Sequence, residues 1–409
     1  MAPQDVEQNK NVNKPELPKW QRPEKTKHDL PWADIQIINL STFNEPGGKE
    51  KLAAELRDAI LKIHHTGFFS VVGTGISAAE VQRQYDIAQA FFALPHEAKA
   101  KPEYKCDFAN GNYFGYREIY EATIRGTEVR NNVEQWNHAK FTGLYEKEAR
   151  HPFFKPYEDE IAEFSRKALD VSLKLLELCA IILELPPSFF ADQHRYDSPS
   201  DDHLRYMSYR PRSPEDDARV DNTWTRAHTD FGTLTLLWSQ NVAGLQIKTS
   251  PNSSSPGNPD EEGEDQGEWK YVPPVEQDDN TGIICNVGDA LDFWSASYLK
   301  STTHRVVRPP ADQLGANRLG LFYFVRPGDE AEIKPAAASP LLRRLGLVKS
   351  SSEEEGQVSD DNQGGEGEKV TGKMYVRERV KDYHSHGDYA DRKGQVFQVG
   401  NLRIVDEAR

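Results

Sequence analysis

The chain has 409 residues, 37% of them hydrophobic, with 50 basic and 65 acidic side chains and a formal net charge of −15. This composition allows a sizeable core and excludes a coiled coil, a collagen-like chain and a fully disordered chain. The acidic balance argues against nucleic acid or an anionic membrane as a partner. No apolar run reaches the roughly 18 residues that span a bilayer, and the first thirty residues lack a signal-peptide core, so we expect a soluble cytoplasmic protein.

Two polar stretches hold most of the net charge. Asp260 to Glu268 carries six acids and no base, and Glu353 to Lys369 carries seven acids and one base, so together they account for −12 of the −15. Both stretches have too few apolar residues to offset the entropy lost on ordering. We therefore expect a solvated acidic insertion at 249–268 and an acidic linker at 350–369.

The chain before residue 200 predicts mainly helices. Residues 1–30 are typical of a disordered tail, and residues 31–195 of a helical region that contains two short strands. Helical periodicity runs over 50–65, and a capping box at 77–80 begins a second helix. A third and longer helix is predicted over 157–185, where a proline pair ends it.

After residue 200 the pattern changes to short β-rich runs separated by turn residues. They are LRYMSY, RAHTD, TLTLLW, GLQIK, WKYVP, GIICNV, ALDFW, HRVVR and RLGLFYFV. Eight or nine strands without intervening helices predict a double-stranded β-helix, or jelly roll, over 200–330, with the acidic insertion between two of its strands. The fold class is thus α+β with a mainly β core and flanking helices. Residues 331–409 predict a C-terminal helical segment that ends in a helix and a tail.

Three residues of this β region are candidates for a metal site: His228, Asp230 and His304. Residues i and i+2 of a strand point to the same face, so His228 and Asp230 can both project inward, and a later strand can add His304. Two imidazoles and one carboxylate bind one face of a metal and leave its other positions open, which suits non-haem Fe(II) and its oxygen chemistry.

A second His-x-Asp sequence shows how weak this signal is by itself. His386 and Asp388 stand beside His384 in a charged stretch without β character, and no histidine follows them. We interpret this second sequence as a solvated surface.

Around the first His-x-Asp sequence the chain resembles a known family. The segments are AHTDFGTLTLL (227–237), GLQI (244–247), NVGD (286–289) and STTHRV (301–306), preceded upstream by GFFSVVGTGIS and FFALPHEAK within 34–99. They are similar, in the same order, to the iron and 2-oxoglutarate dependent dioxygenases of the isopenicillin N synthase-like group. The resemblance covers about two thirds of the chain.

The resemblance implies roles for particular residues. It makes His228, Asp230 and His304 the iron ligands and Arg318 the partner of the distal carboxylate of 2-oxoglutarate, for which a guanidinium fork is well suited. Tyr209 matches the tyrosine that helps to hold that carboxylate. The family motif is Arg-x-Ser, however, and Gly320 replaces the serine. The missing hydrogen bond to a charged group is worth roughly 1.5 to 3 kcal/mol.

The implied reaction consumes Fe(II)-bound 2-oxoglutarate and O2, releases succinate and CO2, and hydroxylates or desaturates a small organic molecule. Several aromatic residues are candidates for the substrate wall, which would suit a flat or apolar molecule better than a highly charged one. They are Phe231, Trp294, Phe322, Tyr113, Phe114 and Tyr116, with Asn112 beside them.

Two alternatives remain open on the sequence alone. One is an iron oxidase of the isopenicillin N synthase type that uses no 2-oxoglutarate, with Arg318 binding substrate; the departure from the family motif at Gly320 keeps this alternative open. The other is a jelly-roll binding protein without catalysis. Release of succinate separates the first alternative from the main hypothesis, and binding of one Fe(II) separates the second. Neither the substrate nor the oligomeric state follows from the sequence.

Overall fold

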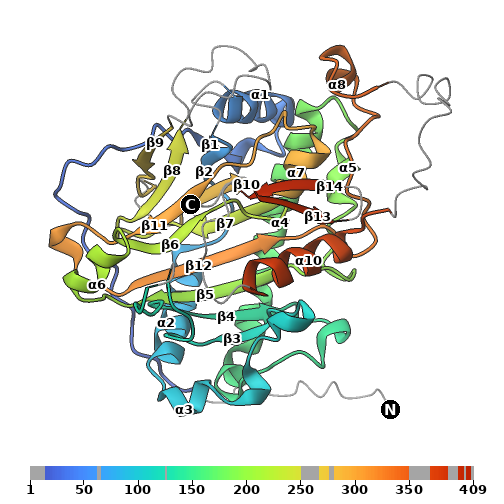
Figure 1. Ribbon diagram of the computed structural model, residues 1–409. Helices are drawn as coiled ribbons and strands as arrows, with labels where there is room; N and C mark the ends of the chain where they lie inside the picture. Colours follow the sequence, from blue (N-terminus) through green and yellow to red (C-terminus); the bar gives the residue numbers. More distant parts are fainter. Residues whose placement is uncertain are drawn as a thin grey trace, which may run out of the picture.

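The computed structural model describes residues 14–61, 66–124, 127–249, 267–275, 281–349, 369–385, 395–399 and 402–406. Two β-sheets form its centre, and helices surround them (Figure 1). Within these ranges, no helix is long and apolar enough to cross a membrane.

The larger sheet has eight strands, and all of its pairings are antiparallel except the one at its β1 edge. In spatial order they are β1 (Ile37–Asn39), β2 (Phe68–Val72), β10 (Ile283–Val287), β7 (Leu234–Trp238), β12 (Arg318–Val325), β5 (His203–Tyr209), β4 (Val133–Ala139) and β3 (Gly115–Arg117). The smaller sheet consists of β6 (Thr223–His228), β11 (His304–Val307), β8 (Leu245–Thr249) and β9 (Glu268–Tyr271).

Helices cover the larger sheet on the side away from the smaller one, where α2 and α4 contact β12. The longer helices are α1 (Gly48–Leu61), α2 (Ala78–Phe92), α4 (Glu158–Ile182) and α10 (Gly372–Ser385). The short ones are α3 (His96–Lys99), α5 (Ser188–Ala191), α6 (Pro214–Arg219), α7 (Asp289–Trp294) and α8 (Pro340–Arg344). Ser77 and Glu80 form the predicted capping box at the start of α2.

Alternation along β12 separates the helix-covered core from the space between the sheets. Leu319, Leu321, Tyr323 and Val325 are at most 5% exposed and belong to the core under the helices. Arg318, Phe322 and Phe324 line a cavity between the two sheets. A strand buried on both faces therefore carries apolar side chains toward the helices and a mixed set toward the cavity. The two facing sheets form the predicted double-stranded β-helix.

The disordered tail predicted for residues 1–30 is wrong for residues 14–30. Trp20 is only 6% exposed and stacks on Tyr85 with the ring centroids 4.1 Å apart. Its backbone N–H donates to the Asp86 carboxylate over 2.7 Å. Residues 1–13 lie outside the described residues. So do most of the acidic insertion, most of the acidic linker and the second His-x-Asp sequence.

The strand predicted for ALDFW is wrong, because this run forms helix α7. Asp289 and Asp292 fall in its first turn, where a carboxylate favours a helix. Ala290, Leu291 and Trp294 are its buried apolar residues, at helical rather than alternating spacing.

Two further strand pairs were missed by the sequence analysis. Strands β3 and β4 lie inside the region predicted to be helical, and β4 pairs with β5 along seven residues. The predicted C-terminal tail contains the hairpin of β13 (Gln395–Val399) and β14 (Leu402–Asp406). Its signal was two alternating runs on either side of Gly400-Asn401, a dipeptide typical of hairpins.

Candidate active site

Three side chains from different positions in the chain converge between the two sheets. His228 ends β6, His304 begins β11, and the two residues are directly paired in the smaller sheet. Asp230 lies just beyond β6, in the connection to β7, rather than on the strand as expected. The ligand atoms of the three residues lie within 4.8 Å of one another, which is compact enough to hold one metal ion.

Backbone carbonyls orient both imidazoles. The Nδ1 atom of His228 lies 2.9 Å from the carbonyl oxygen of Arg226, and that of His304 lies 3.1 Å from the carbonyl oxygen of Thr302. A carbonyl only accepts, so each Nδ1 carries the proton and each Nε2 keeps its lone pair. The two Nε2 atoms lie 3.8 and 3.9 Å from oxygens of Asp230. This is the orientation that metal-binding histidines need.

The Asp230 carboxylate is held in its charged form by its neighbours. One of its oxygens, Oδ2, accepts hydrogen bonds from Thr235 over 2.7 Å and from Asn286 over 2.9 Å. Burial favours the neutral acid, but His304, His228 and these two donors outweigh burial and lower the pKa of Asp230 to about 2. Burial, reinforced by the neighbouring His304, lowers the pKa of His228 to about 3. An anionic carboxylate and a neutral imidazole are the forms that bind metals.

The connection that carries Asp230 is fixed by the start of α7. The backbone N–H groups of Gly288 and Asp289 donate to the carbonyls of Thr233 and Asp230 over 3.0 and 2.7 Å. A Cβ on Gly288 would lie 2.3 Å from the Gly232 carbonyl oxygen, so only glycine allows this close approach. Two residues of the NVGD sequence therefore position Asp230. The backbone N–H of Asp289 binds its carbonyl group, and the Asn286 side chain binds its carboxylate.

Arg318 lies in one part of the cavity, which we call the Arg318 end. We define this end by the lining residues Tyr209, Thr225, Leu245, Val306 and Arg318. Arg318 is 3% exposed, and its Nε and one Nη nitrogen have no hydrogen-bond partner. Its guanidinium carbon lies 5.2 Å from the centroid of the Tyr209 ring, and Arg318 pairs with Tyr209 across β12 and β5. The Tyr209 hydroxyl lies 3.0 Å from the Thr225 hydroxyl. A buried arginine with unused donors is well suited to bind a carboxylate.

The ring of Phe322 occupies the place that a side chain at Gly320 would take. A Cβ on Gly320 would lie 2.4 Å from a ring carbon of Phe322. The serine expected from the family motif therefore has no room while Phe322 keeps this position. The hydroxyl of Thr225 instead faces the same cavity.

The cavity has a volume of about 120 Å³, and part of the predicted substrate wall lines it. Phe231, Phe322 and Tyr113 do so. Trp294 does not line this cavity, because it lies in α7 and donates its indole N–H to the Glu332 carbonyl over 2.9 Å. The prediction for Trp294 is therefore wrong.

Two more predicted wall residues and the nearby asparagine also lie outside the cavity lining. The Tyr116 hydroxyl donates to Glu134 over 2.6 Å. Phe114 packs in a small separate cluster with Tyr145, and the Asn112 amide donates to Glu148 over 2.8 Å. Adjacent residues of a strand point in opposite directions, so a run such as NYFGY cannot place every ring in one pocket.

A second arginine-rich part of the cavity was not predicted from the sequence. We call it the Arg326 end and define it by Tyr113, Arg205, Phe231, Phe324 and Arg326. Position 326 continues the alternation of β12 that brings 318, 322 and 324 to the cavity. Arg205 likewise alternates with Tyr209 along β5, so the periodicity of the two strands was the available signal.

The residues present fit a divalent iron and a 2-oxo acid. Two nitrogens and one carboxylate on one face would hold Fe(II) and leave positions for the keto and carboxylate oxygens of the acid. Arg318 would then take the distal carboxylate, satisfying nitrogens that are otherwise buried without partners.

Comparison with known proteins identifies the family. Residues 35–158 match the family described as the N-terminal region of non-haem dioxygenases of morphine synthesis, and residues 200–327 match the 2OG-Fe(II) oxygenase superfamily. A UPF0676 protein of Schizosaccharomyces pombe is 32% identical over 273 residues, which are 66% of this chain and 76% of that protein. The proline hydroxylase buaE of Petromyces alliaceus is 26% identical over 322 residues, 76% of this chain and 92% of the hydroxylase.

A solved structure shows the same fold. A full-length Neurospora crassa protein, crystallised in complex with alpha-KG, superimposes with a TM-score of 0.66 at 19% identity, covering 88% of this chain and all of that one. These matches remove the alternative of a non-catalytic binding protein. The chain belongs to the 2OG-Fe(II) oxygenase superfamily and is a dioxygenase that uses Fe(II), 2-oxoglutarate and O2.

Proposed function

We propose that this enzyme hydroxylates a C–H bond of a small organic molecule at the site formed by His228, Asp230 and His304. One molecule each of substrate, 2-oxoglutarate and O2 gives the alcohol, succinate and CO2, with one oxygen atom going to each organic product. Arg318 holds the distal carboxylate of 2-oxoglutarate. The hydroxylase named among the relatives supports hydroxylation as the outcome.

The observation that carries this proposal is the state of Arg318. Its guanidinium is buried and two of its nitrogens lack partners, although it lines the same cavity as the His228–Asp230–His304 cluster. Leaving a charged group buried and unpaired is costly, so such a group is retained where a ligand completes it. Burial lowers the pKa of Arg318, which nevertheless stays protonated at neutral pH as arginine does.

Each residue has a task that follows from its contacts. Bound Fe(II) would supply the activation of O2, and the protein supplies position and exclusion of water. Carbonyl groups aim the two imidazoles, and hydrogen bonds from Asn286 and Thr235 hold the carboxylate of Asp230 in place. Apolar side chains line the remaining cavity and keep the reacting C–H bond away from bulk water. They are Phe68, Leu237, Leu245, Ile284 and Val306.

Gly320 argues less strongly for an oxidase without 2-oxoglutarate than the sequence suggested. Thr225 presents a hydroxyl to the cavity, linked to Tyr209 over 3.0 Å. We infer that Thr225 takes over the hydrogen bond of the family serine. The distal carboxylate would then be held by Arg318, Tyr209 and Thr225.

Product analysis tests the proposal. The full chain is incubated with Fe(II), O2 and isotopically labelled 2-oxoglutarate, first alone and then with small metabolites, and labelled succinate is measured by mass spectrometry. We expect oxygen-dependent succinate that rises with a true substrate, and neither bound iron nor succinate with His304→Ala. An O2-consuming reaction that forms no succinate would contradict the proposal.

A further inference from the structure

We propose that the substrate is a small carboxylic acid whose carboxylate is bound by Arg326 and Arg205 at the Arg326 end of the cavity. This inference rests on the proposed function, because it names the class of molecule that the same site oxidises. It also changes the earlier expectation that the cavity suits a flat or apolar molecule better than a highly charged one.

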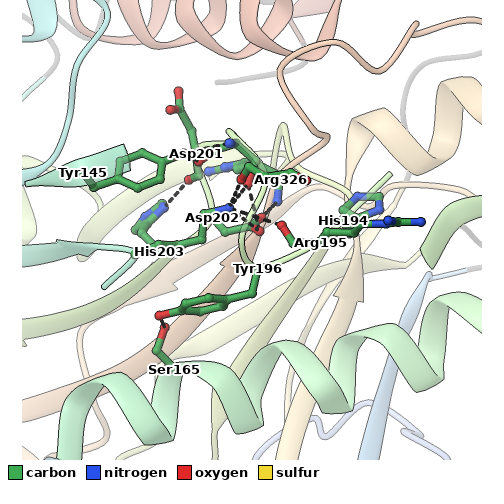
Figure 2. Close-up of polar contacts among 12 residues, drawn as sticks. Tyr145, Ser165, His194, Arg195, Tyr196, Asp201, Asp202, His203 and Arg326 are labelled. Atoms are coloured by element: carbon green, nitrogen blue, oxygen red, sulfur yellow. Dashed lines mark hydrogen bonds and ion pairs between the residues drawn. The ribbon is translucent and has the colours of Figure 1, made fainter. Parts of the chain in front are cut away.

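Arg326 is buried and fixed, but one of its donors is unused. The side chain is 2% exposed, its Nε lies 3.3 Å from the Tyr113 hydroxyl, and one Nη nitrogen has no hydrogen-bond partner. Its guanidinium carbon lies 4.1 Å from the centroid of the Phe231 ring. The neighbouring Asp202 binds the Arg326 backbone N–H (Figure 2) rather than its guanidinium. An arginine that lines a cavity, is held in place and has an unused donor is prepared for an anion.

Gly232 makes the position of Arg326 possible. A Cβ at Gly232 would lie 2.6 Å from an Nη nitrogen of Arg326 and 2.4 Å from the Val325 carbonyl oxygen. The guanidinium thus lies against the backbone two residues after Asp230. This places a fixed positive charge beside the metal-ligand sequence.

Arg205 adds a second, half-buried cation whose side-chain partners are neutral. Its Nε donates to the Asn137 side chain over 2.6 Å, and one Nη lies 3.2 Å from His203 Nε2. Its guanidinium carbon lies 4.3 Å from the centroid of the Phe324 ring. Burial, followed by the neighbouring Arg326, lowers the pKa of Arg205 to about 10. Arg205 is therefore charged at neutral pH.

Within the described part of the chain, the two arginines of this end form no direct ion pair. Among the described residues, no carboxylate lies within 4.0 Å of the guanidinium of Arg205 or Arg326. In the loaded site, the charges of Fe(II), Asp230, Arg318 and doubly ionised 2-oxoglutarate cancel. The positive charges of buried Arg326 and of half-buried Arg205 and Arg117 remain in the cavity lining, and an anionic group of the substrate would compensate part of them.

A carboxylate fits this end better than a neutral ring does. The planar guanidinium matches the two oxygens of a carboxylate. The faces of Phe231 and Phe324 are already covered by Arg326 and Arg205, so a substrate ring cannot stack on those faces. With a volume of about 120 Å³, the cavity favours a small acid.

Matched acids and amides test the inference. The full chain is loaded with Fe(II) and saturated with 2-oxoglutarate under nitrogen, so that no turnover occurs and the Arg318 end is filled. Binding of benzoate and benzamide, and of phenylacetate and phenylacetamide, is then measured by calorimetry, with phenyl phosphate as a second oxyanion. We expect each acid to bind at least ten times more tightly than its amide and more tightly than phenyl phosphate.

Variants link this preference to the arginines. Arg326→Met and, separately, Arg205→Met should reduce the preference for acid over amide to less than threefold, and Arg326→Lys should keep part of it. The affinity for 2-oxoglutarate and the melting temperature are measured in each variant to show that the fold and the Arg318 end are intact.

Several outcomes would overturn the inference. They are an acid preference that survives both Met variants, amides that bind as well as acids, tighter binding of phenyl phosphate, or no binding of any acid. Failure of the proposed function would give a different result, because wild-type protein would then not bind 2-oxoglutarate. The comparison of acids with amides can still be made in the absence of 2-oxoglutarate, and it would still test the two arginines.

Discussion

The two ends of the cavity each contain a buried arginine from the same strand region, but the two arginines have different surroundings. Arg318 begins β12 beside Tyr209 and Thr225, and two of its nitrogens have no partner. Arg326 follows the end of β12, is covered by Phe231, and has one nitrogen without a partner. The first end offers several donors for a long diacid, whereas the second offers two cations for a short anionic group. The comparison suggests that one strand selects both the co-substrate and the substrate.

Removing Asp230, the proposed anionic metal ligand of this cavity, should have the largest effect. Asp230→Ala deletes the anionic ligand, so we expect succinate formation to fall by about 100-fold or more and Fe(II) binding to be lost. Activity and metal content measure this. Asp388→Ala alters the second His-x-Asp sequence and is the matched control, which should retain iron and activity. Equal losses in the two variants would contradict the assignment.

Replacing each of the two arginines by methionine tests whether the two ends of the cavity are separate binding sites. Arg318→Met removes charged hydrogen bonds to 2-oxoglutarate, so its dissociation constant should rise by about 100-fold. Arg326→Met should change that constant by less than threefold. Anaerobic titration of the Fe(II) protein, followed by the visible absorption of its 2-oxoglutarate complex, measures both. Similar weakening by the two substitutions would mean that the ends are not separate sites.

A smaller effect should come from the hydroxyl at the Arg318 end. Thr225→Val keeps the shape of the side chain but removes one hydrogen bond, so we expect about tenfold weaker binding of 2-oxoglutarate. Thr225→Ser retains the hydroxyl and is the control. If valine binds the co-substrate as well as serine does, Thr225 does not replace the family serine.

The smallest effect concerns an acid near the Arg326 end. Burial raises the pKa of Asp201 to about 6, although Arg377 and Arg326 oppose the shift. The folded-state pKa of Asp201 lies above its ordinary value, so the bound proton contributes to the free energy of unfolding. This contribution is fully present below about pH 4 and is lost as the pH rises through 6. Asp201→Asn should therefore increase the free energy of unfolding by about 1 to 3 kcal/mol at pH 7.5 and little at pH 4.

Urea unfolding at the two pH values measures this difference. Exposed Asp170 provides the control, and Asp170→Asn should change little at either pH. A loss of stability in Asp201→Asn at pH 7.5 would show that the ionised Asp201 compensates Arg326, and would weaken the contrast between the two ends.

The sequence predicted the centre of the site better than its walls. The spacing of His228 and Asp230 and the β character of their surroundings indicated the metal site, and the family motif indicated Arg318. Arg326 was missed because it lies just past the last strand residue, where alternation is no longer assumed. Arg205 was part of a quoted strand, yet alternation gives only the face of a side chain and not its depth or its neighbours.

The errors in the fold have similar physical causes. The run ALDFW contains strand-forming residues, but the contacts of Gly288 with the Gly232 loop begin a helix there. Trp294 consequently faces Phe190 and His194 instead of the cavity. Trp20 was assigned to a tail because its neighbours in the sequence are polar. The ring on which it stacks, that of Tyr85, lies 65 residues later in the chain. Such distant contacts carry no local signal.

A crystal structure of the full chain with Fe(II) and 2-oxoglutarate, grown without oxygen, tests the central claim most directly. Anomalous scattering should show one iron, about 2.0 to 2.2 Å from the Nε2 atoms of His228 and His304 and from an oxygen of Asp230. The distal carboxylate should lie on Arg318, with Arg326 left for the substrate. Iron bound elsewhere, or the distal carboxylate of 2-oxoglutarate bound to Arg326, would contradict the account.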